Sequence, residues 1–388
     1  MRIISAEEKT VSLSSNKKNA KISFNEMTAS AVIIEIQTNR GQFKGLGFSS
    51  YGRYGHGGLL RERFLPRLKN IKNIPTDGTC TEIIANIWDN LMTDEKEGGH
   101  GERSGAVGVL ETALWDALAK SEGLPLWALL KRDTEFIETK DAPSGQTPIY
   151  ASGGLYNPEN TGTNELVAEV KQNIDTGYAW SKIKIGGIDP NKDMTRIEAA
   201  INAAGGSELI AVDANCAFGQ NKEKPFLREI DQLGLRWLEE PVDPLDYQGL
   251  KICIDAMNTP IATGENIFSR ADTRNLLQYG TLRANFDILQ MDIVLSYGIT
   301  EYIRMIKLIE ALGWSRRSII PHAGHQVALQ TAAGLGLGGH EVASGKTGPF
   351  CGVSTDTRVE NGLAILGSSP GVGIENKPEL YKFFQSIF

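Results

Sequence analysis

The sequence predicts an α/β protein in which a closed barrel of parallel strands is joined to a smaller α+β unit. From Thr147 onward, short apolar runs alternate with amphipathic helical stretches, a pattern typical of βα units around a parallel sheet. Asp213, Glu239 and Glu265 each close such a run, and 26 residues separate one from the next. That interval fits one strand, one helix and two loops. The three carboxylates are therefore expected at the carboxyl ends of successive strands, which meet on one face of a barrel.

The first part of the chain has a different pattern and is expected to form an α+β capping domain over residues 1–130. The segment VIIEIQTNRGQFKGLGF alternates like two strands, with NRG at residues 39–41 as the turn, so it predicts a β-hairpin. Helices are expected in LLRERFLPRLKNI, over 82–91 and over 106–119. The last of these is apolar on most faces and is expected to be buried. The polar stretch 132–146 is expected to be a linker.

The barrel is expected to span residues 147–345. Its strands are predicted in the runs PIYAS, SKIKIG, ELIAVDA, RWLEEP, PIATGE, FDILQMD and RSIIPHA, and a short element near His340 and Glu341 completes the ring. Together these elements predict a (β/α)7β, or modified TIM, barrel. Residues 346–388 contain turn signals and short strands. They are expected to form a tail that packs back on the capping domain.

Composition and charge restrict the class of protein. The chain has 388 residues, of which 41% are apolar and 22% charged, enough to bury a large core. A net charge of −7 argues against nucleic acid as a partner. The four cysteines are widely spaced without a CxxC pair, as expected for free thiols in a reducing compartment. With no signal pattern and no apolar run near the roughly 20 residues that span a bilayer, we expect a cytoplasmic protein with no membrane partner.

The three carboxylates predict a metal site. Brought together, they repel one another, and without a cation at least one would be protonated. Mg²⁺ prefers oxygen ligands and is the usual ion where few protein ligands leave positions for water and substrate. We therefore expect one Mg²⁺ per chain on Asp213, Glu239 and Glu265. Each alone is as often a salt-bridge partner, but their regular spacing favours a metal. Glu240 is expected to point away from this site.

Two lysines are candidates for acid/base chemistry. Lys182 and Lys184 bracket Ile183, and residues two apart on a strand share a face. Both amines are therefore expected inside the barrel mouth. Burial beside a second cation lowers the pKa of an amine and allows it to act as a base. The alternative is an edge strand with two solvated lysines, which the apolar neighbours Ile183 and Ile185 make improbable.

A carboxylate and a histidine are expected on the sixth and seventh strands. His322 needs a carboxylate to fix its tautomer and raise its pKa, and Asp292 on the neighbouring strand is placed to supply it. Opposite Lys184, His322 becomes the second acid/base group; alone it is more often structural. Glu341, on the last barrel element, is either a contact for a substrate or a salt-bridge partner. Structural or solvated roles are expected for His325, His56, His100 and Arg103.

Taken in order, these motifs resemble those of the enolase superfamily in its mandelate racemase-like subgroup. The resemblance rests on KIK (Lys182, Lys184), VDAN (Asp213), EEP (Glu239), GEN (Glu265), the Asp292 and His322 pair and Glu341. It covers nearly the whole chain. It implies a Lys or His base that works with Mg²⁺ on an enediolate, which is a property of that superfamily rather than a deduction from this chain. It also implies a homo-oligomer.

Longer segments are similar to those of the D-tartrate dehydratases in that subgroup. They are GRYGHGGLLRERF, EKEGGHGERS, KIKIGG, GENIFS, IPHAGHQ and TRVENG. The implied activity is Mg²⁺-dependent dehydration of a small acid sugar, a 2,3-dihydroxy carboxylate such as D-tartrate, to a 2-keto acid. Glu341, Asn215 and Tyr51 are the expected substrate contacts. Tyr51 stands where a smaller polar residue is expected, in a cap loop that faces the distal end of the substrate.

Three other functions remain open on the sequence. A base on each face of the α-carbon also permits racemisation or epimerisation of a 2-hydroxy acid. A barrel that binds a metal and an organic acid without turnover would need neither Lys184 nor His322. A Schiff-base aldolase would use one of the lysines but has no use for three metal-binding carboxylates. A nucleotide-binding fold is disfavoured, because the glycine clusters lack a P-loop lysine between a strand and a helix.

Overall fold

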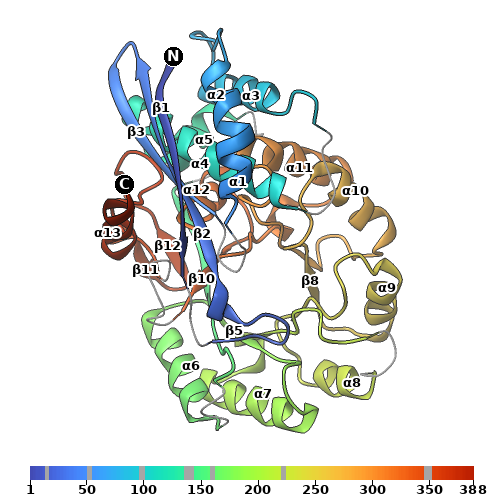
Figure 1. Cartoon of the computed structure of the whole chain (residues 1–388). Coiled ribbons are helices and arrows are strands. Elements are labelled where there is room, and N and C mark those ends of the chain that lie inside the picture. The colour runs from blue at the N-terminus through green and yellow to red at the C-terminus, as the bar shows by residue number, and fades with distance from the viewer. Residues whose placement is uncertain are drawn as a thin grey trace.

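The computed structural model describes residues 1–13, 17–49, 55–95, 101–134, 144–157, 162–219, 224–344 and 352–388. These residues form a three-stranded antiparallel sheet with its helices and a larger, mainly parallel barrel (Figure 1). The architecture agrees with the predicted fold class. The exact limits of the capping domain, the barrel and the tail stay predictions.

The N-terminal sheet has the order β1 (Arg2–Ser12), β2 (Thr28–Thr38) and β3 (Gly41–Phe48). Thr38 pairs with Gly41 across the β2–β3 turn, so the predicted hairpin is confirmed. The helices of this part are α1 (Gly57–Leu59), a π-helical turn (Leu60–Phe64), α2 (Leu65–Asn70), α3 (Cys80–Leu91), α4 (Glu102–Glu122) and α5 (Leu126–Asp133). The first three are continuous and confirm the helix expected in LLRERFLPRLKNI.

Helix α4 lies against β3 so closely that the strand needs glycine. A Cβ on Gly45 would lie 1.8 Å from the carbonyl oxygen of Ala113, and one on Gly47 would lie 2.3 Å from that of Val109. The helix is buried along nearly its whole length, as predicted from its apolar faces. Close contact of this kind fits the small residues of α4 that face these two glycines, Ala113 and Ala117.

The barrel strands from β4 to β9 follow one another in sequence order, and each of these pairs in parallel with the next. The barrel strands are β4 (Gln146–Ser152), β5 (Ser181–Lys184), β6 (Ile210–Asp213), β7 (Leu238–Glu239), β8 (Ile261–Thr263), β9 (Ile288–Leu289) and β10 (His340–Ala343). The helices are α6 (Asn164–Thr176), α7 (Pro190–Ala204), α8 (Lys224–Gln232), α9 (Tyr247–Ala256), α10 (Arg270–Tyr279), α11 (Ile299–Ala311) and α12 (Gln326–Leu335). Short 3₁₀ turns span Phe24–Glu26, Ser207–Leu209 and Arg316–Ser318.

The run RSIIPHA, expected to be a strand, forms only one bridge. Ile319 pairs with Leu289 next to β9, and its carbonyl accepts a 2.9 Å hydrogen bond from the amide of Gly338. Pro321 lies two residues after Ile319, and a proline has no N–H with which to continue a ladder. The run still fills the position between β9 and β10, and β10 pairs in parallel with β4, so the ring closes.

The C-terminal segment touches both parts of the molecule. Strands β11 (Arg358–Glu360) and β12 (Leu363–Ile365) form a hairpin, and β12 pairs antiparallel with the start of β4. Helix α13 (Pro378–Ile387) brings Phe384 edge-on to Phe48 of β3, with 6.4 Å between the ring centroids. In Figure 1 this helix lies beside the N-terminal sheet.

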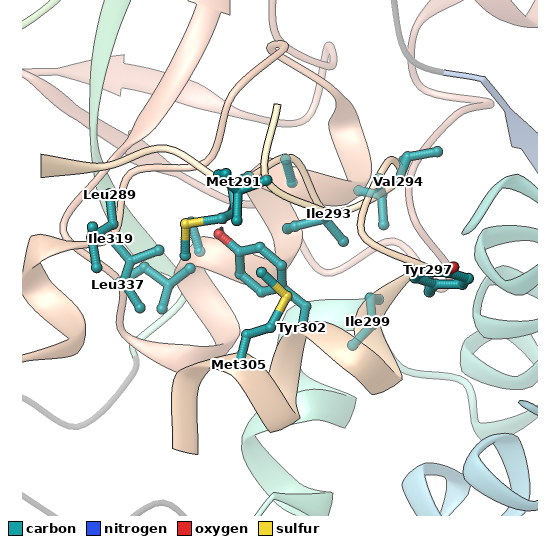
Figure 2. Packing of buried hydrophobic residues seen from close by; sticks show 14 of the residues in the cluster. Leu289, Met291, Ile293, Val294, Tyr297, Ile299, Tyr302, Met305, Ile319 and Leu337 are labelled. Atoms are coloured by element: carbon teal, nitrogen blue, oxygen red, sulfur yellow. Dashed lines mark hydrogen bonds between the residues drawn. The ribbon is translucent and has the colours of Figure 1, made fainter. Parts of the chain in front are cut away.

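The apolar core continues behind strand β9 (Figure 2). Leu289, Met291 and Ile293 alternate toward helix α11 and are buried, and the Tyr302 hydroxyl of that helix donates a 3.1 Å hydrogen bond to the carbonyl of Met291. The residues between them therefore face the barrel interior. Across the described ranges, no helix has the length and apolar character needed to cross a bilayer.

Candidate active site

Three strand ends bring the predicted carboxylates together. Asp213 closes β6 and pairs in register with Glu239, which closes β7. Glu265 follows β8 after Gly264, whose φ of +126° turns the chain into the barrel mouth. One oxygen from each of the three carboxylates lies within 4.8 Å of the others, and all three residues are buried. Three carboxylates that lie 26 residues apart in the sequence thus form one compact cluster.

The cluster has the chemistry of a divalent-cation site. Its donors are hard carboxylate oxygens, the type that Mg²⁺ binds. Burial, and then repulsion from Asp213, raise the pKa of Glu239 to about 8. A shared dication would remove that repulsion. The residues therefore fit a bound Mg²⁺ without rearrangement of the strands.

Both lysines point into the cluster, as predicted. Lys182 Nζ lies 2.5 Å from Glu239 Oε1, 3.1 Å from Glu341 Oε1 and 3.6 Å from Asp213 Oδ2, and 5.7 Å from the centre of the Tyr150 ring. Lys184 forms an ion pair with Asp213 Oδ2. The two amines thus reach the triad from strand β5, the neighbour of β6.

The direction of the lysine pKa shifts differs from the expectation. Burial favours the neutral amine of Lys182, but Glu239 and Glu341 outweigh it and raise the pKa well above its usual value. For Lys184, burial and then attraction by Asp213 compete, and the pKa is again raised. The expectation of a lowered pKa considered burial and the second lysine but not the neighbouring carboxylates. The carboxylates outnumber that lysine, and a cation among them would oppose their effect.

His322 lies on the other side of the triad. Its Nδ1 is 3.0 Å from Asp292 Oδ2 and its Nε2 is 3.3 Å from Glu265 Oε2. Although burial favours the neutral ring, Glu265 and then the hydrogen bond with Asp292 raise the pKa of His322 to about 9. The Asp292 carboxyl, buried but held by His322, has its pKa lowered to about 2. The predicted pair is therefore in contact, and the proton of the pair resides on the imidazole.

Two of the expected substrate contacts lie at the cluster. Glu341 Oε1 contacts Lys182, and its Oε2 accepts a 3.1 Å hydrogen bond from the amide of Ala323. The backbone N–H of Asn215 donates to Asp213 Oδ1 at 2.8 Å, and its side-chain Nδ2 donates to Asp213 Oδ2 at 3.3 Å. The side-chain Oδ1 of Asn215 is buried and has no hydrogen-bond partner among the described residues. Tyr51 lies outside the described residues, as does His100, so both assignments stay predictions.

The remaining predicted histidines and Arg103 are placed away from the triad. His56 is buried with Nδ1 2.8 Å from Glu102, and His325 is buried 4.9 Å from the Phe48 ring. Arg103 donates to the Tyr297 hydroxyl at 3.1 Å and contacts Glu95. These positions agree with structural roles.

Sequence reasoning missed two polar residues next to the triad, Trp237 and Gln290, and it wrongly expected Glu240 to point away, since Glu240 shares the Asn266 amide with Glu265. Trp237 and Gln290 both donate to Glu239 Oε2, and Glu240 accepts a 2.9 Å hydrogen bond from Asn266. Glu240 is buried with φ +41°. Burial, and then Glu265, raise the pKa of Glu240 well above its usual value. The alternation of strand residues could have placed Trp237 and Gln290 inside the barrel; the conformation of Glu240 had no sequence signal.

The chain is similar to known proteins over almost its whole length. Residues 165–380, more than half of the chain, match the model of the family described as "Enolase C-terminal domain-like". The chain is 28% identical over 314 residues to the L-talarate/galactarate dehydratase of Salmonella typhimurium, covering 80% of this chain and 72% of that protein. It is 26% identical over 210 residues to the L-Ala-D/L-Glu epimerase of Bacillus subtilis, covering 54% and 52%.

Solved structures agree in fold. A mandelate racemase/muconate lactonizing enzyme from Polaromonas sp. JS666 superposes with a TM-score of 0.73 at 25% identity, covering 96% of this chain and 93% of that one. The L-talarate dehydratase from the same organism, complexed with Mg and L-glucarate, has a TM-score of 0.72 at 24% identity, covering 96% and 94%. A barrel of this type with carboxylates at three successive strand ends defines a class of metal-assisted acid/base proteins.

The chain belongs to the enolase C-terminal domain-like family. Within it, the relatives just described place the chain in the mandelate racemase-like subgroup of the enolase superfamily.

Proposed function

We propose that this protein is a Mg²⁺-dependent dehydratase that converts a small acid sugar, a 2,3-dihydroxy carboxylate, to a 2-keto acid. One observation carries the proposal. The triad is flanked by an amine on one side, where Lys184 pairs with Asp213, and by an imidazole on the other, where His322 Nε2 is 3.3 Å from Glu265. A substrate held between them would have a proton-transfer group at each face.

The cofactor of this proposal is one Mg²⁺ per chain, held by Asp213, Glu239 and Glu265. The fit of the three buried carboxylates supports it, and two related structures were solved with Mg. When bound, the ion withdraws negative charge that develops on the substrate carboxylate. The Lys182 ammonium lies 2.5 Å from Glu239 and faces the same region, so it is placed to stabilise that charge as well.

The proton transfers are assigned to two residues. The carboxylates alone raise the pKa of Lys184, but a cation bound to Asp213 would oppose that effect and favour the neutral amine. The neutral Lys184 takes the α-proton and becomes an ammonium ion. His322, protonated and held by Asp292, gives its proton to the β-hydroxyl, which leaves as water. The resulting enol tautomerises to the 2-keto acid. The Asp292 carboxylate, 3.0 Å from Nδ1 of His322, stabilises the charged imidazole that supplies the proton for this step.

D-Tartrate is the proposed substrate, and oxaloacetate would then be the product. Support for a sugar acid comes from the relatives named as dehydratases of L-talarate/galactarate, arabinonate and D-xylonate. Support for tartrate itself comes from the similarity of the sequence segments around residues 52–64 and 95–104 to the D-tartrate dehydratases. We further propose that the protein is a cytoplasmic homo-oligomer.

Epimerisation is the second candidate function. Relatives named as epimerases match this chain, and Lys184 and His322 on opposite sides of the triad form a pair of bases that fits epimerisation as well. In that case the α-proton would be removed from one face and returned to the other, and no water would be lost.

The test is a screen of the Mg²⁺-loaded protein with a library of acid sugars, D-tartrate included. Formation of a 2-keto acid supports dehydration, whereas an epimer without keto acid supports the second function. Turnover of neither kind by any acid sugar would contradict both.

Lys184→Ala tests the assignment of the base. We expect exchange of the substrate α-proton with deuterated solvent to fall by about 10²-fold or more, the lower end of what a positioned base contributes. Mg²⁺ binding, measured by calorimetry, should persist because the three carboxylates are intact. Exchange at the parental rate would show that Lys184 is not the base.

A further inference from the structure

The two oxygens of Glu239 have different partners. Oε1 faces the charged amine of Lys182 at 2.5 Å. Oε2 accepts a 3.0 Å hydrogen bond from Trp237 Nε1 and a 2.8 Å hydrogen bond from Gln290 Nε2. All three donors are buried, with 1% of their surface exposed. Glu239 is therefore held on one side by neutral donors and on the other by a cation.

The fold places both neutral donors by simple geometry. Trp237 precedes Glu239 by two residues, so both side chains point into the barrel. Gln290 lies between Leu289 and Met291, which pack outward behind β9 (Figure 2), so its amide is directed inward. The amide orientation is also determined. With Oε1 of Gln290 turned toward Glu239, two acceptor oxygens would face each other in a buried site.

We propose that Trp237 and Gln290 are positioning residues that fix Glu239 as a metal ligand with Oε1 toward the cation. This inference rests on the proposed Mg²⁺ site. The Lys182 ammonium competes with a cation for Oε1, because both carry positive charge. The neutral N–H groups on Oε2 do not compete, so they hold the carboxylate in the same orientation with and without the ion. Such outer hydrogen bonds typically strengthen metal binding by about 10- to 100-fold.

A cluster of three buried aromatic residues inside the barrel, Tyr150, Trp180 and Trp237, provides a control variant for the change at Trp237. Trp180 and Trp237 both contact Tyr150, with ring centroids 5.1 Å and 5.2 Å from it, and they are 5.6 Å from each other. The indole N–H of Trp237 reaches Glu239. That of Trp180 is buried without a hydrogen-bond partner among the described residues. Replacing either ring by Phe disturbs the same aromatic cluster, and for Trp180 also the Arg236 guanidinium 4.0 Å above its ring. Only the change at Trp237 removes a donor from the metal ligand.

The experiment measures Mg²⁺ affinity by calorimetry on metal-stripped protein, without substrate. The variants are Trp237→Phe, Gln290→Met and the control Trp180→Phe. We expect the first two to raise the dissociation constant for Mg²⁺ by at least about tenfold and the control to leave it unchanged. Urea unfolding of the metal-free proteins is measured alongside, because a merely structural role would change the unfolding midpoint and not selectively the metal affinity.

The outcomes separate this inference from the proposed function. If Trp237→Phe does not fold, Gln290→Met, which keeps the length and apolar volume of the side chain, decides alone. Parental Mg²⁺ affinity in the folded variants would overturn the inference and leave the proposed function standing. Equal weakening by Trp180→Phe would also overturn it, since packing would then be the cause. A parent protein that binds no Mg²⁺ would overturn the proposed metal site together with the inference.

Discussion

Lys182 connects the charged groups of the site. Its amine contacts Glu239, Glu341 and Asp213 and lies over the Tyr150 ring. With only 1% of its side chain exposed, removing it would leave three buried carboxylates without their shared counter-charge. Losing one partner of a buried ion pair costs about 3–5 kcal/mol. Lys182 therefore has a structural role beside its proposed catalytic one, and variants at this position do not separate the two roles.

His322 allows a cleaner test at the residue scale. In His322→Asn, the proposed acid for water loss is removed while Lys184 is kept. We expect keto-acid formation to fall by about 10²- to 10⁴-fold, while exchange of the substrate α-proton with deuterated solvent continues. Both rates are read from one proton NMR time course in deuterated buffer. Unchanged keto-acid formation would assign the acid to another residue.

Much of the site was predictable from residue spacing, for a physical reason. Parallel strands in a barrel end on one face, so polar residues that close successive strands must converge; Asp213, Glu239 and Glu265 did so. The orientation of single side chains was not predictable in the same way. That Gln290 reaches Glu239 depends on side-chain rotamers and on the width of the barrel, which no local pattern encodes.

At the scale of elements, the contact between β3 and α4 fixes the capping sheet on its helix. A Cβ on Gly45 would meet backbone atoms, the Ala113 oxygen at 1.8 Å and the Ala117 nitrogen at 2.7 Å. Backbone within a buried helix cannot move aside as a flexible side chain does. The position therefore requires glycine for space rather than for a special backbone angle.

Gly45→Ala tests this contact. We expect the free energy of unfolding to fall by about 3 kcal/mol, the upper end for overpacking of a core, and we would measure it from urea denaturation. The control is Gly58→Ala in α1, where an added Cβ has nothing within 4 Å and a gain of about 0.5–1 kcal/mol is expected from helix propensity. Equal midpoints for Gly45→Ala and the parent would contradict the reading of this interface.

Elements were predictable where periodicity was long. The helix over 106–119 and the hairpin at 39–41 are confirmed, since each has a sustained pattern or a turn signal. RSIIPHA failed as a strand because Pro321 interrupts the ladder, although the run occupies the expected place in the ring. The π-helical turn Leu60–Phe64 had no signal in the apolar pattern, which is also compatible with an α-helix.

At the scale of the whole molecule, buried titratable groups make stability depend on pH in opposing directions. Burial lowers the pKa of His340 to about 3, below the value of about 6.5 in the unfolded chain. His340 therefore resists protonation in the folded state. The stability that its neutral ring contributes is present above pH 6.5 and is lost as the pH falls below that value. By pH 5 the loss is about 2 kcal/mol.

His340→Asn should therefore change how the free energy of unfolding depends on pH, and not only its value at a single pH. We expect the difference in unfolding free energy between parent and variant to shrink by about 2 kcal/mol from pH 7.5 to pH 5, measured by urea titrations at each pH. A difference that is constant with pH would contradict the buried neutral state of this ring.

Glu111 should make the stability of the protein change with pH in the opposite direction. It lies on α4 and accepts a hydrogen bond from the Thr300 amide at the start of α11. Burial raises its pKa to about 7, so its stabilisation is full below about pH 4.5 and is lost as the pH rises through 7. Relative to Glu111→Gln, the parent should lose about 2 kcal/mol between pH 5 and pH 7.5. If urea titrations gave the parent and Glu111→Gln the same dependence of unfolding free energy on pH, the raised pKa of Glu111 would be contradicted.

The pairing of β12 with β4 has a consequence for synthesis on the ribosome. The first strand of the barrel leaves the exit tunnel early, yet its partners β10 and β12 lie roughly 190 to 220 residues later in the chain, which at about 5–20 residues per second arrive some tens of seconds afterwards. Until then one edge of the nascent sheet has unpaired backbone groups. Closure of the barrel therefore depends on residues made long after its first strand, and the emerging chain is most exposed to mispairing and to chaperones during that interval.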